Sequence, residues 1–337
     1  MLKILLVHND YGSAAPSGEN QAFAAELALL HAIGPRAARV LTLHNYWLFC
    51  PAAIALRNDR VCTDCLNRRS SWPALWHGGY RESRWATLPL AFSVGLRRML
   101  GTWTRHVDAF IALTDFQRDR MIAAGLPAEL VHVKPNFYPG NPTPVPWAAR
   151  RPSVVFAGRL TAAKGVMALV RAWLLWGAAA PELRMVGDGE LRGDLERLAA
   201  TAPEIPIRFL GQLAGDAAQA EIARARLLVL PSECFEGFPM VVREAFAFGT
   251  PAAVSAIGPL PSIVQSGRSG VVFAPANPES LLREVHAAWE TPGLLERLGQ
   301  GARQAFEARY TEDANAQMLM AIYQQAITVN QERRGGR

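Results

Sequence analysis

Short apolar runs alternate with amphipathic stretches through the second half of the chain. The runs predict strands at 153–157, 183–186, 207–210, 227–230, 252–254 and 271–273. Apolar residues recur at helical spacing between and after them, at 165–178, 190–200, 216–224, 239–248, 278–290 and 313–328. Continuous apolar strands separated by helices are typical of a parallel sheet covered on both faces, so this half is predicted to be α/β.

The first half repeats the pattern with fewer elements. Strands are predicted at 3–8, 39–43, 108–113 and 131–133, and helices at 19–32, 88–105 and 115–124. Between the halves, five prolines within 138–152 prevent a regular helix or central strand. We therefore predict an N-terminal domain at 1–137, a linker at 138–152, a C-terminal domain at 153–310, and a last helix with its tail at 311–337.

The composition agrees with two globular domains. The 337 residues suffice for two cores, and 50% hydrophobic with 19% charged residues excludes wholesale disorder. Four cysteines do not make a disulfide scaffold, and Met1–Lys3 lead directly into an apolar run that predicts a strand rather than an export signal. The longest uncharged apolar stretch, 85–96, is shorter than the roughly 18 residues that a membrane span needs. The expected location is cytoplasmic.

The positive charge of the chain is concentrated in one segment. Residues 60–106 hold eight arginines, no lysine and two acidic residues, so their excess equals the net charge of +6 of the whole chain. The same segment contains Trp72, Trp76, Trp85 and Trp103. A basic, aromatic segment is found where proteins bind nucleic acid, a membrane surface or an anionic ligand. The alternative is a solvated helix face with buried tryptophans.

A loop with two glycines and two cations, Gly158-Arg-Leu-Thr-Ala-Ala-Lys-Gly165, directly follows the strand at 153–157. Such a turn exposes backbone N–H groups at the start of the next helix, and Arg159 and Lys164 add positive charge, so the loop suits a diphosphate. Its spacing is neither a Walker motif nor G-x-G-x-x-G, which disfavours a nicotinamide cofactor. The alternative is a capped turn with exposed charges.

Two carboxylates, Glu236 and Glu244, follow the strand at 227–230. Pro239 is expected in the first turn of the next helix, which puts Glu236 in the loop and Glu244 in the second turn. The intervening Gly237-Phe238-Pro239 makes a tight helix entry with free N–H groups. A helical carboxylate at that depth can accept hydrogen bonds from two sugar hydroxyls, while Glu236 and the loop N–H groups meet a second polar ring.

Three further features are open to a structural or a functional interpretation. Gly187-Asp-Gly-Glu190 lies at the same predicted sheet edge, as a turn or as a ligand contact. His44, followed by Asn45, ends the strand at 39–43, as a satisfied structural residue or as part of a binding site. A zinc site could use three cysteines and one histidine, but a single Cys-x2-Cys is a weak signal and packed thiols are favoured; these residues are Cys50, Cys62, Cys65 and His77.

The spacing of Glu236 and Glu244 resembles the E-x7-E signature of retaining GT-B glycosyltransferases of family 4 (glycosyl transferases group 1). The loop 158–165 resembles the phosphate-binding loop of that family. The similarity runs from residue 1 to about 325 and is strongest at 153–275. It implies a GT-B fold, with two Rossmann-like domains whose parallel sheets face a central cleft, and a C-terminal helix that crosses back to the first domain.

The resemblance also implies roles for single residues. Arg159 and Lys164 would stabilise a departing nucleotide diphosphate, and Glu244 would hold the ribose hydroxyls. Glu236 would contact the donor sugar near the reacting centre, and His44 matches a strand-end histidine close to that sugar. The implied catalytic residues are Glu236, Arg159, Lys164 and His44; the donor-binding residues are Gly158, Arg159, Lys164, Gly187, Glu236, Gly237, Phe238, Pro239, Glu244 and Gly18; the acceptor-side residues are Glu19, His44 and Asn45. No conventional nucleophile, cofactor or divalent metal is expected.

The sequence departs from this family in two places. Only 32–39 separate the predicted helix at 19–32 from the next strand, where relatives carry roughly 50 to 60 further residues, so the N-terminal sheet is predicted to be incomplete. Near Gly78-Gly79, close relatives carry another cysteine, which lowers the expectation of a metal.

These observations predict a hexosyl-type retaining glycosyltransferase of surface glycan synthesis. It would transfer a sugar from a nucleotide diphosphate sugar to a lipid-linked or polysaccharide acceptor, with residues 60–106 in peripheral contact with the anionic inner face of the cytoplasmic membrane. Nucleic acid is disfavoured as a partner because no helix-turn-helix or RNA-binding signature occurs. The alternative, motivated by the missing segment, is a catalytically impaired remnant that binds a nucleotide or another protein.

Overall fold

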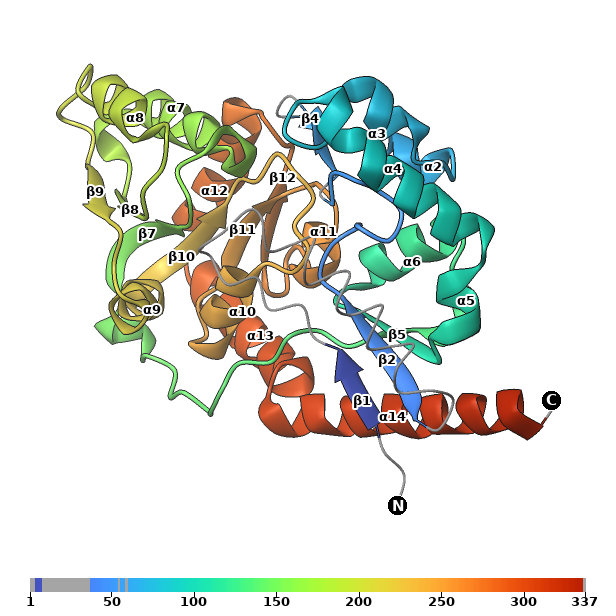
Figure 1. Cartoon of the computed structure of the whole chain (residues 1–337). Coiled ribbons are helices and arrows are strands. Elements are labelled where there is room, and N and C mark those ends of the chain that lie inside the picture. Colours follow the sequence, from blue (N-terminus) through green and yellow to red (C-terminus); the bar gives the residue numbers. More distant parts are fainter. Residues whose placement is uncertain (1–3, 8–36, 54, 58–59, 336–337) are drawn as a thin grey trace. The chain divides into compact units, whose positions relative to one another are not determined.

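The computed structural model describes residues 4–7, 37–53, 55–57 and 60–335 (Figure 1). The chain divides into two compact units. The first unit consists of Met1–Ala55, Cys62–Pro135 and Asn315–Arg337, and the second consists of Leu56–Val61 and Asn136–Ala314. The predicted helix at 19–32, together with Gly18 and Glu19, lies outside the described residues.

A six-stranded parallel sheet forms the centre of the second unit. Its strands follow the six predicted ones closely and are β7 (Arg151–Ala157), β8 (Glu182–Val186), β9 (Ile207–Gly211), β10 (Ala225–Leu230), β11 (Ala252–Ser255) and β12 (Gly270–Phe273). They are arranged in the order β12-β11-β10-β7-β8-β9, which is that of a doubly wound Rossmann sheet. The order reverses between β7 and β10, which lie side by side (Figure 1). Ligands of such sheets bind beyond the carboxyl ends of the two strands that flank this point.

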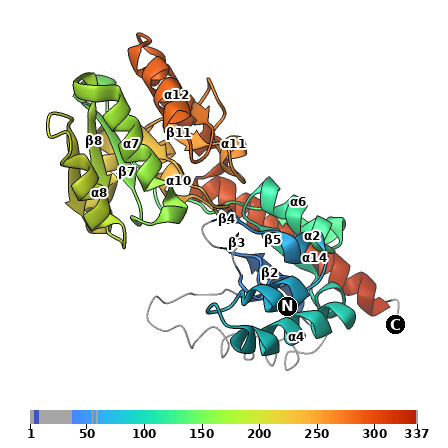
Figure 2. The ribbon, with the colours of Figure 1, turned by 90° about the horizontal axis from the view of Figure 1, so that it is seen from above.

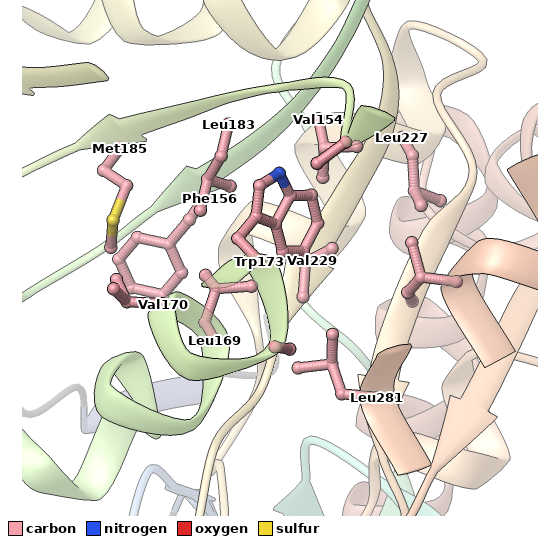
Figure 3. Close-up of a cluster of buried hydrophobic side chains, with 14 of the residues drawn as sticks. Val154, Phe156, Leu169, Val170, Trp173, Leu183, Met185, Leu227, Val229 and Leu281 are labelled. Atoms are coloured by element: carbon pink, nitrogen blue, oxygen red, sulfur yellow. The ribbon is translucent and has the colours of Figure 1, made fainter. Parts of the chain in front are cut away.

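Helices cover both faces of this sheet because each has an apolar stripe to bury. The predicted helices are found as α7 (Val166–Trp176), α8 (Arg192–Ala199), α9 (Gly215–Arg224), α10 (Met240–Ala247) and α12 (Pro278–Glu290). The core on one face is built around Trp173, which is fully buried among β-sheet and α7 side chains (Figure 3). Its indole Nε1 donates to the carbonyl oxygen of Pro181 at 2.8 Å, so this large side chain leaves no polar atom unpaired.

Two helices of the second unit were not predicted. They are α11 (Leu260–Ile263) and α13 (Leu294–Arg309). The α13 sequence carries two glycines in mid-helix, Gly299 and Gly301, which lower its intrinsic helix propensity. Buried Leu295, Leu298 and Phe306 nevertheless give it an apolar face that packs against α10 and β12. Tertiary packing therefore decides the conformation here.

The first unit contains a smaller parallel sheet. Its strands are β1 (Ile4–Val7), β2 (Ala38–Leu43), β5 (Ala109–Ala112) and β6 (Val131–Val133), in the order β1-β2-β5-β6. The four predicted strands are therefore confirmed. Among the described strands the order never reverses, so they make one half of a doubly wound sheet. This agrees with the predicted incompleteness of the N-terminal sheet.

Helices of the first unit depart from the prediction around one glycine. A single helix was expected at 88–105, but α4 (Arg84–Met99) ends before Gly101, and α5 (Thr102–His106) begins after it. Gly101 has a φ of +61°, which interrupts the helix. The predicted helix at 115–124 is confirmed as α6 (Asp115–Ala124), whereas α2 (Asp64–Asn67) and α3 (Trp72–His77) were not predicted. The antiparallel pair of β3 (Leu56–Arg57) and β4 (Arg60–Val61), which belongs to the second unit, was not predicted either.

The last helix, α14 (Glu312–Gly335), carries most of its length in the first unit. Ile322 and Ala326 pack against the buried side chains of β2 and β5. Near its end, Arg333 Nη1 lies 3.1 Å from Oδ1 of Asp108, which precedes β5. Of the described helices, none combines the length and the apolar content needed to cross a membrane.

Candidate functional site

Two loops of the second unit meet at the point where its strand order reverses. The β7 loop (158–165) follows β7, and the β10 loop (231–239) follows β10. Glu233 N–H donates to the carbonyl oxygen of Ala163 at 2.9 Å and joins the loops. Gly165 has a φ of +65°, and a Cβ there would lie 1.9 Å from the carbonyl oxygen of Pro231. Glycine is therefore required for the contact between the two loops.

A partly buried ion pair links the predicted residues of these loops. Lys164 Nζ lies 2.6 Å from Oε1 of Glu236, and their side chains are 19% and 12% exposed. Ser232 Oγ donates to the same Glu236 oxygen at 2.5 Å. The carboxylate and the ammonium group are thus held in a fixed orientation at the carboxyl ends of β7 and β10. Sequence reasoning missed Ser232, although its position four residues before Glu236 within the same loop was a usable signal.

Arg159 supplies the second cation of the β7 loop. Its side chain is exposed, and within the described parts of the chain no carboxylate forms an ion pair with it. The positive charge of Arg159 also acts on the pKa of the Cys234 thiol. Burial and the negative charge of Glu236 raise this pKa, while the positive charges of Lys164 and Arg159 lower it. Cys234 is therefore a protonated thiol rather than a nucleophile. Arg159 remains available for an anion.

The loop after β8 packs against the β7 loop. Gly158 N–H donates to Val186 O at 3.0 Å, and Leu160 N–H donates to Asp188 O at 2.9 Å. Gly187 has a φ of +132°, and a Cβ there would lie 1.9 Å from the carbonyl oxygen of Gly158. Gly187 therefore lies at the predicted sheet edge, where its lack of a side chain allows the loop after β8 to pack closely against the β7 loop.

Helix α10 begins at the same edge. Pro239 is its N-cap rather than a member of its first turn, which corrects the expected helix start by one residue. Glu244 lies in the second turn, as predicted. In the described structure, no protein group accepts a hydrogen bond from the backbone N–H of Gly237, Phe238 or Met240. A helix start of this kind attracts an anion.

Glu244 is a partly buried carboxylate on α10. Burial raises its pKa, and the neighbouring Arg243 guanidinium opposes the rise. Arg243 Nη2 lies 3.6 Å from Glu244 Oε1, donates through Nη1 to Phe137 O, and has its guanidinium 5.4 Å from the centroid of the Tyr138 ring. Arg243 was not predicted, because its sequence position between an apolar and an acidic residue carries no signal of its contacts.

The remaining predicted residues belong to the first unit or lie outside the described residues. His44 and Asn45 directly follow β2, and Asn45 Oδ1 accepts a hydrogen bond from Trp47 N–H at 3.0 Å. Gly18 and Glu19 are not described. The structure therefore gathers the second-unit residues at one sheet edge and places His44 and Asn45 at the end of a strand, as expected.

Two of the three cysteines of the first unit, Cys50 and Cys65, form a pair of contacting thiols. Cys50 and Cys65 are buried, none of the four cysteines is in a disulfide, and a hydrogen bond between Cys50 and Cys65 lowers the pKa of the first and raises that of the second. His77 Nε2 instead lies 3.2 Å from Asp64 Oδ2. Within the described residues, no group of three or more histidine, cysteine or acidic side chains could hold a metal ion.

Comparison with known proteins identifies the region that carries the two loops. Residues 151–291 match the family model of glycosyl transferases group 1. This region is therefore similar to a glycosyltransferase group 1 domain. It contains the whole β7 loop and the whole β10 loop, and therefore every residue predicted in the second unit.

Curated relatives of this chain are longer than the matched region. An uncharacterized glycosyltransferase of Methanocaldococcus jannaschii is 31% identical over 176 residues, which are 52% of this chain and 45% of that protein. The alpha-D-kanosaminyltransferase of Streptomyces kanamyceticus is 27% identical over 66% of this chain and 61% of its own length. The chain thus spans between about half and three fifths of these two relatives.

Solved structures show the fold class of the chain. The crystal structure of HepE from Anabaena in complex with UDP has a TM-score of 0.64 and 18% identity, and it covers 94% of this chain and 76% of that one. Together with the two parallel sheets, this likeness shows the predicted GT-B fold.

Proposed function

We propose that this chain is a family 4 retaining glycosyltransferase. It transfers a sugar from a nucleotide diphosphate sugar to a hydroxyl of a lipid-linked or polysaccharide acceptor in surface glycan synthesis. The observation that carries the proposal is the meeting of the β7 and β10 loops at the reversal of strand order, where Arg159, Lys164, Glu236 and Glu244 gather around an open helix start.

The diphosphate of the donor is bound by positive charge and by backbone donors. Arg159 and Lys164 supply two cations, and the N–H groups at the start of α10 supply aligned hydrogen-bond donors. Stabilisation by these groups grows as negative charge develops on the leaving diphosphate, so it lowers the barrier to transfer. These two cations take the role of a divalent metal. The UDP and UDP-glucose in structures of Anabaena HepE support a donor of this class.

Glu244 binds the ribose of the donor. An ionised carboxylate can accept hydrogen bonds from two adjacent hydroxyls, and the second turn of α10 holds this one rigidly. The positive charge of Arg243 beside Glu244 opposes the rise in the Glu244 pKa that burial causes, and so favours the ionised carboxylate.

Glu236 orients the donor sugar and does not attack it. Its Oε1 already accepts from Lys164 and Ser232, so this oxygen is engaged in holding the loops together. Transfer then occurs on the face of the leaving group: the bond between the sugar carbon and the phosphate oxygen breaks, the acceptor oxygen bonds to that carbon, and its proton passes to the departing diphosphate. His44 serves near the donor sugar and, with Glu19 and Asn45, on the acceptor side.

The proposed acceptor and the proposed location are both supported by the basic, tryptophan-containing segment at 60–106. A basic segment with exposed tryptophans at 60–106 supports peripheral attachment to an anionic membrane, where lipid-linked acceptors are found. The chain is therefore proposed to work at the cytoplasmic face of the membrane.

A thermal-shift screen with UDP-, GDP- and ADP-sugars tests this proposal. One donor class should raise the unfolding temperature, because a ligand at a hundredfold excess over its Kd adds about 2.7 kcal/mol to the unfolding free energy. Glu244→Ala should remove the shift, whereas Glu290→Ala, which truncates an exposed carboxylate at the end of α12, should keep it. A chain that none of the donors stabilises, or a shift that survives Glu244→Ala, contradicts the proposal.

The second candidate is a catalytically impaired remnant that binds a nucleotide or another protein. It is favoured by one observation: among the described strands of the first unit, the order never reverses, so that sheet lacks the feature at which doubly wound sheets bind ligands. Hydrolysis or transfer of the stabilising donor, lost in Glu244→Ala, favours the enzyme. Donor binding without turnover on any membrane or glycan acceptor favours the remnant.

A further inference from the structure

Helix α4 is apolar on two opposite faces. Its buried face carries small side chains, Thr87, Ala91 and Val94. Five larger apolar side chains of α4 are exposed: Trp85 85%, Leu88 41%, Phe92 67%, Leu96 38% and Met99 78%. At 3.6 residues per turn these five positions fall within an arc of about 80° opposite the buried face. We call them the α4 stripe. A helix of a soluble protein places its large apolar residues inward, so this inversion marks a contact surface.

Tryptophans extend the exposed apolar surface from α4 to α3, which packs against it. Trp72 and Trp76 are 67% and 73% exposed, whereas Trp103 is buried. The Arg84 guanidinium lies 5.4 Å from the Trp76 ring centroid, and Arg84 Nε donates to Trp76 O, so Trp76 borders the start of α4. In Figure 2, α4 lies at the margin of the first unit. Three of the four tryptophans at 60–106 therefore face solvent rather than a core.

The arginines of the first unit at 62–106 are of two kinds, structural and exposed. Arg98 Nη2 donates to Ala124 O at 2.7 Å and its guanidinium lies 4.4 Å from the Phe49 ring, and burial lowers the pKa of both Arg97 and Arg98. These two stabilise the fold. The exposed arginines of the first unit at 62–106 are Arg68, Arg69, Arg81, Arg84 and Arg105.

The exposed apolar side chains and the exposed arginines together favour one binding partner for this surface, an anionic bilayer. Trp side chains favour the boundary between headgroups and acyl chains, and arginines favour lipid phosphates. A second copy of the chain would instead bring two clusters of arginines together, with few acids to oppose them. Of the two acidic residues at 60–106, Asp64 already contacts His77. The charge and the apolar stripe are both complementary to an anionic bilayer surface.

We propose that α4 lies in the headgroup layer of an anionic bilayer, with Trp85, Phe92 and Met99 of the α4 stripe inserted among the acyl chains. Trp76 anchors the start of the helix, and the exposed arginines contact lipid phosphates. This inference rests on the proposed membrane attachment and specifies the side chains that perform it. It does not depend on donor binding.

Flotation of the full chain with vesicles tests the inference without any donor. Vesicles of phosphatidylcholine alone are compared with vesicles that also contain phosphatidylglycerol. The chain should float with the anionic vesicles, and Trp85→Ser/Phe92→Ser should lower its partition coefficient at least about tenfold, because two large apolar groups no longer insert. Met320→Ser, at a 64% exposed position of α14, is the matched control and should float as the wild type does.

Two further variants separate insertion from charge and from misfolding. Trp85→Phe/Phe92→Leu keeps the apolar stripe and should keep flotation. Arg68→Gln/Arg81→Gln should weaken binding to anionic vesicles about fivefold for each arginine removed, whereas Arg171→Gln on α7 should not. Equal flotation of wild type and Trp85→Ser/Phe92→Ser, or self-association of the chain that this variant abolishes, overturns the inference. An unfolding temperature equal to that of the wild type, measured for every variant without donor, shows that the fold is intact.

Discussion

Glu236 Oε1 accepts hydrogen bonds from Lys164 Nζ and from Ser232 Oγ. These two contacts show how far the role of a single residue can be predicted from the sequence. The chemistry of Lys164 and Glu236 could be predicted, because both follow strand ends at fixed spacing from glycines. Their contact could not, because 72 positions separate them and only the parallel pairing of β7 with β10 brings them together. Ser232 was missed although it lies only four residues before Glu236, because the sequence does not show which loop hydroxyl meets the carboxylate. Its importance lies in a buried contact, not in its residue type.

The raised pKa of Glu244 predicts a pH dependence of donor binding. The ionised carboxylate accepts hydrogen bonds from the ribose, so donor affinity should rise with pH through the Glu244 pKa, with a midpoint above the ordinary range of a glutamate because burial raises it. In the chain without donor the sign is opposite: a raised pKa contributes stability at low pH that is lost as pH rises through it. Calorimetric Kd values measured across pH check the first effect.

Glu244→Gln is the test of that assignment. It should remove the pH step and weaken donor binding at neutral pH about tenfold, since a hydrogen bond to a charged acceptor contributes roughly 1.5 kcal/mol or more. A step of unchanged midpoint in Glu244→Gln would assign the titration to another group.

Elements were predictable where hydrophobic periodicity was strong. All six strands of the second sheet and most of its helices were found within a few residues of their expected positions, because each buries a continuous apolar run or stripe. The failures have physical causes. Mid-helix glycines obscured α13, Gly101 divided an expected helix into α4 and α5, and the short α2 and α3 offer too few turns for a period to be read.

Close packing between elements predicts the effect of Gly165→Ala. A Cβ there would meet the carbonyl oxygen of Pro231 at 1.9 Å, and the residue would be strained at a φ of +65°. The unfolding free energy should fall by about 1–3 kcal/mol, and donor binding should weaken as the β7 and β10 loops separate. Denaturant unfolding and the donor thermal shift measure the two effects. Gly215→Ala, at the start of α9 with open space around its Cβ, should change neither; equal behaviour of the two variants would refute the close-approach argument.

At the scale of the whole molecule, the two sheets differ in completeness. Strand order in the second sheet reverses between β7 and β10, and this creates the candidate site. In the first sheet the described strands follow one direction only, which agrees with the short interval between the predicted helix at 19–32 and β2. The apolar pattern of the sequence predicted the α/β class, and the resemblance to the family implied the missing segment. The sequence could not reveal strand order, because order is set by which strands pair and not by where each begins.

Isothermal titration of the chain with the nucleotide sugar selected by the thermal-shift screen tests the central claim most directly. The wild type should bind one donor per chain. Lys164→Ala should weaken binding at least about tenfold, because it removes a cation from the diphosphate and frees Glu236 from its partner. Lys134→Ala, which removes the lysine that contacts Asn315 in the first unit, is the matched control and should bind as the wild type does. Donor affinity that is the same in Lys164→Ala and the wild type would contradict a donor site between the β7 and β10 loops.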